Sequence, residues 1–364
     1  QGCVGGRSCR RGACEPHWLP ITSPEVGATA PRVGHYVVWT GAEVIVWGGH
    51  DPRAADAQVY GDGLRFDPAR GEVKGLSHIA APTPRYDDGT GTAVWTGSEM
   101  VIWGGRGGDG ARSDGAAYVP ALDRWIRYSG ADAPRQSVTT VFTGRDLVLV
   151  PVASPDDALR ASTDLSGFTR VGAMGGTAQQ RLRHSALWTG SELVVWGGVD
   201  ELGHARTDGW RFSPRRRRTR PIAPGAPRSE HLAVWADHEM YVFGGRDASQ
   251  RAMAELVSYV PAMDTWREVN APGAPSPRYG HVAVWTGRSL VVWGGTDGTQ
   301  VFDDGAAYDP WDNAWTRLDA LEAPPRTVAA RDGAVGVWTG SELVVVGGWD
   351  HSDRVEPLGW RYQP

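Results

Sequence analysis

The feature that most constrains the fold is a two-strand segment that recurs through the chain at intervals of about 50 residues. Each copy has an apolar run with an aromatic residue, a turn that contains glycine, and a second apolar run. In every copy the aromatic residue and the first residue after the second run are nine positions apart. These pairs are Trp39/Gly48, Trp95/Gly104, Phe142/Pro151, Trp188/Gly197, Trp235/Gly244, Trp285/Gly294 and Trp338/Gly347. A fixed period of this length is typical of a repeat architecture.

Each copy predicts a short antiparallel sheet of four strands. The first two strands are continuous apolar runs, which favours burial on both faces. A third strand ends in an aromatic-x-Pro signature, where proline stops the ladder. The signatures end at Pro68, Pro120, Pro214, Pro261, Pro310 and Pro364. A fourth strand follows, marked by Trp125, Trp266 and Trp315. Four antiparallel strands in about 50 residues are typical of a propeller blade.

Seven copies predict an all-β, seven-bladed β-propeller of four-stranded antiparallel blades. The last copy stops at Pro364, after its third strand, and the orphan pattern His17–Ile21 resembles a fourth strand. We therefore expect the N-terminal strand to complete the last blade, which leaves no open sheet edge. The expected organisation is a cysteine-containing tail (1–14) and a propeller (15–364).

The double glycine, the aromatic residue and the spaced tryptophan resemble Kelch repeats over most of the chain. The Trp-Thr-Gly-Ser-Glu variant is similar to bacterial Kelch proteins that resemble the central domain of galactose oxidase. This resemblance implies a propeller that binds ligands at one face, and it implies no particular reaction. Galactose oxidase needs a Cys–Tyr crosslink for its copper radical, and the propeller region has no cysteine. We expect no cofactor.

Composition narrows the partners and the compartment. The net charge of −5 points to neither nucleic acid nor an anionic membrane, and the basic run 215–218 is interpreted as a solvated turn. No apolar stretch is long enough for a transmembrane helix. Three cysteines in a short tail indicate an oxidising compartment. We expect Cys9 and Cys14 to form a disulfide and Cys3 to be a lipidation site. The expected protein is bacterial and extracellular, periplasmic or on the cell surface. One free thiol, or zinc held by the tail, is the alternative.

Arginines recur seven residues before the first-strand aromatic residue, at Arg32, Arg135, Arg181, Arg228, Arg278 and Arg331, with Arg85 three residues further out. One interpretation is a positive funnel for carboxylates, sulfate or sugars. The favoured interpretation is a structural ring, in which each arginine pairs with an acid from a nearby loop. The predicted acids lie two residues past the double glycine, at Asp51, Asp200, Asp247, Asp297 and Asp350.

The post-glycine loops differ between blades, and this asymmetry is a better guide to a ligand site. The candidate residues are His50, Arg106, Asp109, Arg246, Asp247, Trp349 and His351. Trp349 is the most suggestive, because an exposed tryptophan can stack on a sugar ring, although burial against the next blade is the alternative. The eroded third copy, from Pro151 to Phe168, is either a docking edge or the result of sequence drift.

Two further sets recur. Histidines four positions before the aromatic residue are candidate metal ligands, but we favour hydrogen bonds to neighbouring backbone: His35, His184, His231 and His281. Acids four positions before the third-strand aromatic residue are interpreted as turn residues, with calcium as an alternative: Asp62, Asp114, Asp208, Glu255 and Asp304.

Two functions remain in contention. The first is an exported, monomeric, non-enzymatic scaffold that binds a glycan or a protein partner on the loop face around the channel. The alternative is a sugar-acid epimerase or lyase, which the Kelch resemblance allows because some Kelch propellers, including sialic acid epimerases, look like they work with an acid and an arginine at the channel mouth. For that enzyme the candidate residues are Arg106, Asp109, Arg246 and Asp247.

Overall fold

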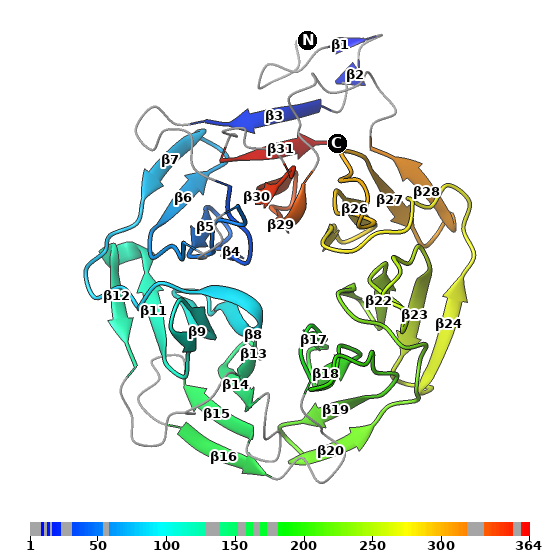
Figure 1. The fold of residues 1–364 in the computed structure, drawn as a ribbon, viewed down its shortest axis with the longest axis horizontal. Helices are drawn as coiled ribbons and strands as arrows, with labels where there is room; N and C mark the ends of the chain where they lie inside the picture. The colour runs from blue at the N-terminus through cyan, green and yellow to red at the C-terminus, as the bar shows by residue number, and fades with distance from the viewer. Residues whose placement is uncertain are drawn as a thin grey trace.

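The computed structural model describes residues 9–10, 13–14, 17–22, 31–53, 58–128, 138–151, 158–162, 168–172, 181–318, 331–351 and 358–364. Seven antiparallel sheets are arranged as blades around a central axis (Figure 1). The prediction of an all-β, seven-bladed propeller is therefore confirmed. A two-stranded ladder outside the ring joins β1 (Cys9–Arg10) to β2 (Ala13–Cys14).

The first three blades follow the chain from blue to green in Figure 1. Blade 1 contains β4 (Tyr36–Trp39), β5 (Val44–Trp47), β6 (Gly63–Asp67) and β7 (Glu72–Gly75). Blade 2 contains β8 (Tyr86–Trp95), β9 (Met100–Gly107), β11 (Gly115–Val119) and β12 (Arg124–Arg127), with the added strand β10 (Gly110–Ala111) and the 3₁₀ turn η1 (Pro120–Leu122). Blade 3 contains β13 (Val138–Phe142), β14 (Asp146–Pro151), β15 (Ala158–Ser162) and β16 (Phe168–Gly172). The third copy has lost its glycines but keeps all four strands.

The other blades complete the ring. Blade 4 contains β17 (Ser185–Trp188), β18 (Leu193–Trp196), β19 (Gly209–Ser213) and β20 (Arg218–Pro221). Blade 5 contains β21 (Leu232–Ala236), β22 (Glu239–Phe243), β23 (Leu256–Val260) and β24 (Thr265–Val269). Blade 6 contains β25 (Val282–Trp285), β26 (Leu290–Trp293), β27 (Gly305–Asp309) and β28 (Ala314–Arg317). Blade 7 contains β29 (Asp332–Trp338), β30 (Leu343–Trp349), β31 (Gly359–Gln363) and β3 (His17–Ile21).

The N-terminal strand closes the ring, as the sequence predicted. β3 pairs antiparallel with β31 over five residue pairs, from His17 opposite Gln363 to Ile21 opposite Gly359, and the two strands lie side by side in Figure 1. Trp18 packs on Trp293 of blade 6, with ring centroids 5.0 Å apart. It thereby takes the place of the fourth-strand tryptophan in blade 7.

The second strand of each blade forms the core between blades. All four residues of β5 are buried. Alternate side chains point to opposite faces of a strand, so Val44 and Val46 pack with Val344 of blade 7, and Ile45 packs with Met100 of blade 2. This two-sided burial explains the continuous apolar runs.

The first strand of each blade lies at the inner edge of the ring, and its ends define two faces. The hairpin turns join the first strand to the second at one face, and the double-glycine loops leave the second strand at the other. We call the second face the channel mouth, and all the recurring arginines and histidines precede the first strand there. In the described residues no helix is long and apolar enough to cross a membrane.

Candidate functional site at the channel mouth

The recurring arginines are buried within the blades and do not line an open funnel. Exposure is 0–3% for Arg85, Arg181, Arg228, Arg278 and Arg331. In each case Nη1 donates to the carbonyl of a glycine in the same blade's double-glycine loop, for example Arg181 to Gly197 at 3.1 Å and Arg278 to Gly294 at 3.0 Å. Burial lowers the pKa of Arg228 to about 10. Arg135 lies outside the described residues.

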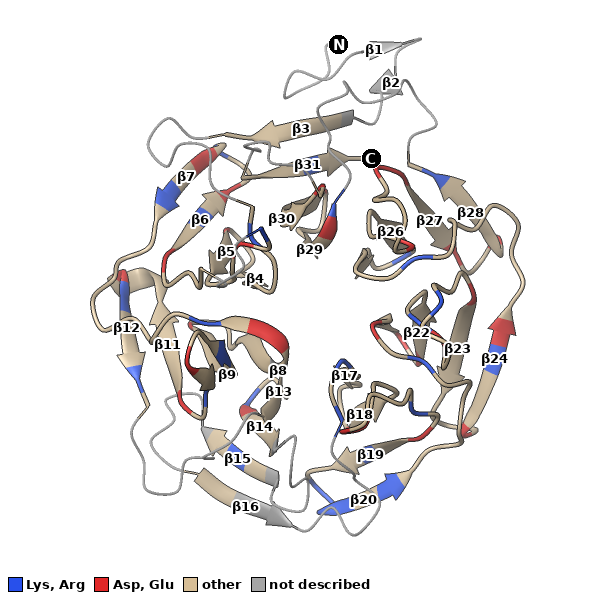
Figure 2. Cartoon of the chain, in the orientation of Figure 1, with Lys and Arg blue, Asp and Glu red and all other residues tan. Residues whose placement is uncertain are grey.

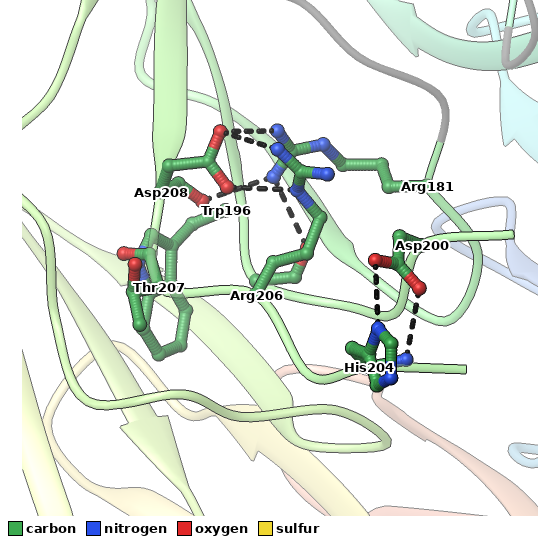
Figure 3. Close-up of polar contacts among 8 residues, drawn as sticks. Arg181, Trp196, Asp200, His204, Arg206, Thr207 and Asp208 are labelled. Carbon is green, nitrogen blue, oxygen red and sulfur yellow. Dashed lines mark hydrogen bonds and ion pairs between the residues drawn. The ribbon is translucent and has the colours of Figure 1, made fainter. Parts of the chain in front are cut away.

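The acids that pair with these arginines are the set interpreted from sequence as turn residues. Ion pairs join Arg32 to Asp62, Arg85 to Asp114, Arg181 to Asp208 and Arg278 to Asp304, at 2.9–3.2 Å. Figure 3 shows Arg181 and Arg206 converging on Asp208. The repeating unit is a guanidinium that ties the end of the second strand to the start of the third.

The predicted pairing of the arginines with the acids two residues past the glycines was wrong for the four that can be checked. Asp51 instead pairs with Arg53 at 2.7 Å. Asp200 accepts the amide hydrogens of Leu202 and His204, both at 2.9 Å, and Figure 3 shows its contacts with His204. The equivalent loop amides bind Asp247 and Asp297. The carboxylate is short and close to its own backbone, so each acid folds its own loop.

Three of the four recurring histidines form hydrogen bonds to a neighbouring blade, and neither ring nitrogen of the fourth, His281, has a partner. His35 bonds the carbonyl of Val346 at 3.1 Å, His184 the hydroxyl of Thr139 at 2.8 Å, and His231 that of Ser185 at 3.0 Å. Each partner belongs to the preceding blade. The first glycine of the pair makes room for this ring, since a Cβ at Gly197 would lie 2.7 Å from Cε1 of His231.

These histidines do not form a metal centre. The described residues contain no group of three or more His, Cys, Asp or Glu that could hold a metal ion. Burial, together with the charge of the nearby recurring arginines, lowers the pKa of His184 to about 4. The same causes lower the pKa values of His35 and His281 to about 3. The rings are therefore neutral spacers between blades.

Two charged residues at the mouth have a backbone conformation, with positive φ, that is unfavourable for residues other than glycine. The residue two past the recurring arginine is glycine at Gly34, Gly280 and Gly333, each with positive φ. The same position holds Arg183 (φ 55°) in blade 4 and Glu230 (φ 54°) in blade 5. A side chain in this left-handed region costs about 1 kcal/mol or more. Backbone strain of this kind clusters at functional sites.

These two residues begin a chain of contacts across blades 4, 5 and 6. Arg183 Nη1 bonds Glu230 Oε1, and Arg246 Nε lies 3.2 Å from Glu230 Oε2. The guanidinium of Arg246 also stacks 3.7 Å from the ring centroid of Tyr279 in blade 6. One glutamate thus joins two arginines, and an aromatic face holds the second of them.

The mouth continues in blade 7 with Asp332, which lies beside Gly280, the residue after Tyr279, and whose side chain is 29% exposed. His351 Nε2 lies 3.3 Å from Asp332 Oδ2, and the ring of His351 packs on Trp349 with centroids 4.5 Å apart. Burial raises the pKa of Asp332, and the charge of Glu230 adds to this. We call the set Arg183, Glu230, Arg246, Tyr279, Asp332 and His351 the mouth cluster.

The insertion in blade 2 reaches over the mouth toward this cluster. The ladder of β8 with β9 shifts register between Tyr86 and Gly91, which accommodates the three extra residues seen in the sequence. The Asp87 carboxylate holds this bend by accepting the Gly89 and Gly91 amides. A Cβ on Gly89 would lie 2.9 Å from the Arg183 nitrogen. Figure 2 shows acidic segments of β8 and β29 at the inner edge of the ring.

The structure separates the candidate residues into two groups. Arg246, Trp349 and His351 lie in or against the mouth cluster. His50 packs on Tyr86 at 4.2 Å between blades 1 and 2, and Asp109 pairs with Arg112 on the exposed hairpin of blade 2.

Trp349 is partly buried and packs on His351. The two acid–arginine pairs proposed for an enzyme come from different parts of the ring: Arg106 and Asp109 belong to blade 2, and Arg246 and Asp247 belong to blade 5.

Four members of the mouth cluster were missed from the sequence: Arg183, Glu230, Tyr279 and Asp332. They lie one or two residues past a recurring arginine. A column-by-column comparison of the copies at these positions would have revealed the substitution of glycine by charge.

A comparison with known protein families gives one result. A family model described as the KLHDC2/KLHL20/DRC7 Kelch-repeats domain matches residues 183–357. The matched region begins at Arg183 in blade 4 and extends into blade 7, so it spans the whole mouth cluster. No curated protein matches the chain.

Proposed function

We propose that this chain, which is a Kelch-repeat β-propeller, is a binding scaffold that engages a protein partner through the mouth cluster. The fold supports the general role, because Kelch propellers present loops around a channel as a binding face. The surface is supported by the asymmetry of the mouth cluster, whose residues lie in blades 4–7. A partner that presents both an acid and a base would match it.

The observation that carries the proposal is the backbone strain at Arg183 and Glu230. Gly34, Gly280 and Gly333 show what the fold prefers at this position. A charged side chain at Arg183 weakens the fold and adds no buried packing, because that side chain is 54% exposed, whereas the side chain of its partner Glu230 is 19% exposed. A residue that costs stability and faces solvent, as Arg183 does, is expected to serve recognition.

Selection of peptides from a displayed library tests this surface. The wild-type propeller is the target, and the double variant Arg183→Gly/Glu230→Gly is used for counter-selection. We expect peptides with mixed charge that bind the wild type and lose at least tenfold in affinity on the double variant. Peptides that bind both proteins equally well, or no enrichment at all, would contradict a recognition role for the mouth.

A sugar-acid epimerase or lyase is the second candidate, and one observation favours it. Asp332 is an acid with a raised pKa whose hydrogen-bond partner is the His351 ring, which is the environment of a general acid or base. Exchange of substrate carbon-bound protons in deuterated water, followed by NMR over a panel of sialic and uronic acids, tests this function. Exchange that Asp332→Asn abolishes would support it, whereas no exchange with any sugar acid would rule it out for that panel.

We also propose that the protein is exported, with a disulfide in its N-terminal tail. Cys9 and Cys14 are directly opposite in the β1–β2 ladder, where facing residues are close enough for a disulfide. Cys3, which lies outside the described residues, is the proposed lipidation site. Intact mass spectrometry tests both: reduction should add the mass of two hydrogens, and a lipid should add the mass of acyl chains.

A glycan ligand for the mouth remains the alternative to a protein partner, and a thermal-shift panel of sugars would detect it.

A further inference from the structure

The face opposite the mouth has a pocket at the seam between blades 3 and 4. The pocket has a volume of about 240 Å³ and is lined by the hairpin turns of both blades and by Pro214. Three arginines, Arg145, Arg160 and Arg215, line it together with a single acid, Asp146. The pocket therefore has an excess of positive charge on a protein of net charge −5.

Three other seams show how this position is normally closed. An arginine in the third strand of one blade donates an Nη1 hydrogen bond to a carbonyl in the next blade. The acceptor is the proline that ends the aromatic-x-Pro signature of that blade. The bonds run from Arg65 to Pro120 at 3.4 Å, from Arg211 to Pro261 at 2.7 Å and from Arg361 to Pro68 at 2.9 Å. Each arginine also lies near a hairpin-turn glutamate, at 3.9, 3.7 and 2.9 Å respectively. We call this arrangement the seam bridge.

Blade 3 has the parts of a seam bridge but does not form it. Arg160 faces Val148 in the ladder, as Arg211 faces Val194 in blade 4. Arg160 lies 3.9 Å from Asp146 but forms no hydrogen bond to Pro214 within the described structure. Its side chain is 51% exposed, against 16% for Arg211.

The residue after the proline explains why the bridge is absent. It is alanine at the three bridged seams: Ala69, Ala121 and Ala262. At the seam between blades 3 and 4 it is Arg215. A second guanidinium beside Pro214 repels Arg160 and leaves both cations facing the pocket.

Arg145 adds a third cation, and a matched residue shows that it is unusual. Arg288 occupies the same turn position in blade 6, where Asp309 neutralises it at 2.7 Å. The ladders place Ser162 in blade 3 where blade 6 has Asp309. Among the residues that the structure describes, Arg145 and Arg215 have no ion-pair partner.

We propose that this pocket binds a small dianion with planar or tetrahedral oxyanions, either a phosphate or a dicarboxylate. Three guanidinium groups against one carboxylate leave two positive charges, and arginine binds such oxyanions through paired N–H donors. The volume is below the range of roughly 300–1,000 Å³ that is typical of sites for drug-sized ligands, so it suits a small anion. This site is independent of the mouth cluster, because it lies at the other end of the strands.

Titration calorimetry with inorganic phosphate and with succinate, at constant ionic strength in chloride, tests the proposal. We expect saturable binding of one of them to the full chain, with one site per chain. Arg145→Ala and Arg215→Ala should each weaken binding tenfold or more, and the matched control Arg288→Ala should leave it unchanged. Binding of phosphate alone would identify a phosphate site, and binding of succinate alone a dicarboxylate site. No saturable binding, or equal weakening by Arg288→Ala, would overturn the proposal.

A second variant separates the pocket from general effects of charge. Arg215→Ala with Asp146→Glu restores the residues found at the bridged seams. We expect Arg160 to bond the Pro214 carbonyl in a crystal structure, the melting temperature to rise, and anion binding to disappear. Anion binding that persists with Arg160 on Pro214 would show that the pocket is not the site.

Discussion

Two tiers of charged residues surround the channel, only a few residues apart in the sequence, and they differ in almost every physical respect. The lower tier is the recurring arginines, which are tied to a glycine carbonyl of their own blade and, in four blades, to an acid as well. The upper tier is the mouth cluster, which spans blades 4–7 and joins residues of different blades.

The difference teaches how a repeat protein separates stability from recognition. A contact that every blade must make can be encoded in the repeat, and its residues are buried and neutralised within the blade. A ligand is not sevenfold symmetric, so a site for it is expected where the repeat is broken. Arg183 and Glu230 break it at a position where Gly34, Gly280 and Gly333 adopt the same backbone conformation without strain. Substitutions in the two tiers should therefore have opposite consequences.

The largest expected effect is in the lower tier. Arg278→Met removes a guanidinium that is fully buried and leaves Asp304 and the Gly294 carbonyl without their donor. Breaking a buried pair by removing one partner costs about 3–5 kcal/mol. Urea denaturation should show this loss of unfolding free energy.

The matched substitution in the upper tier is Arg246→Met. The side chains of Arg246 and Glu230 are 25% and 19% exposed, so water reaches the pair in part, and a loss of about 1–2 kcal/mol is expected, between the values for exposed and buried pairs. Similar losses for the two variants would mean that the mouth cluster also holds the fold together, and the comparison would fail.

Acid provides the second test of the lower tier. The pKa of His281 is about 3 in the folded state, because burial disfavours its charged form, against an ordinary value of 6.5. Between these values the unfolded chain binds the proton and the folded chain does not. Stability from this group is therefore complete above about pH 6.5 and is lost as the pH falls toward 3.

His281→Leu should remove this dependence. Neither ring nitrogen of His281 has a hydrogen-bond partner, so leucine leaves no polar group of the neighbours unpaired and should be nearly neutral at pH 7.5. At pH 4.5 the variant should be more stable than the wild type by about 2–3 kcal/mol. Urea midpoints at the two pH values measure the effect, and the exposed His78 is the control, through His78→Gln. An unchanged acid dependence in His281→Leu would show that the buried ring does not limit stability in acid.

The fold was readable from the sequence because its determinants are local and repeated. The nine-residue spacing from Trp188 to Gly197 requires a hairpin, and seven such hairpins require a ring. The fourth-strand pattern of His17–Ile21 was sufficient to predict closure. Burial on both faces also followed directly, because a strand such as β18 has no polar residue.

The site was harder to predict, because its contacts join blades that are distant in the sequence. The sequence shows that arginines equivalent to Arg181 recur in the blades. Two sets of acids recur with them, one equivalent to Asp200 and one equivalent to Asp208. Only the register of the strands determines that Asp208, rather than Asp200, reaches the guanidinium. The meeting of Glu230 with Arg183 depends on how two blades pack side by side, and no local pattern encodes that packing.

The smallest expected effect is also the most direct test of the upper tier. Arg183→Gly removes a side chain whose backbone has φ 55°, and glycine adopts that conformation without strain. The Arg183 side chain is 54% exposed, and Glu230 keeps its pair with Arg246, so the lost ion pair contributes little. We therefore expect stability to be unchanged or to rise by up to about 1 kcal/mol, while binding of the selected peptides falls. Arg206→Gly is the control, since Arg206 has no positive φ and pairs with Asp208, so it should lose stability. If Arg183→Gly destabilised the fold and left peptide binding intact, Arg183 would serve stability, as the arginines of the lower tier do.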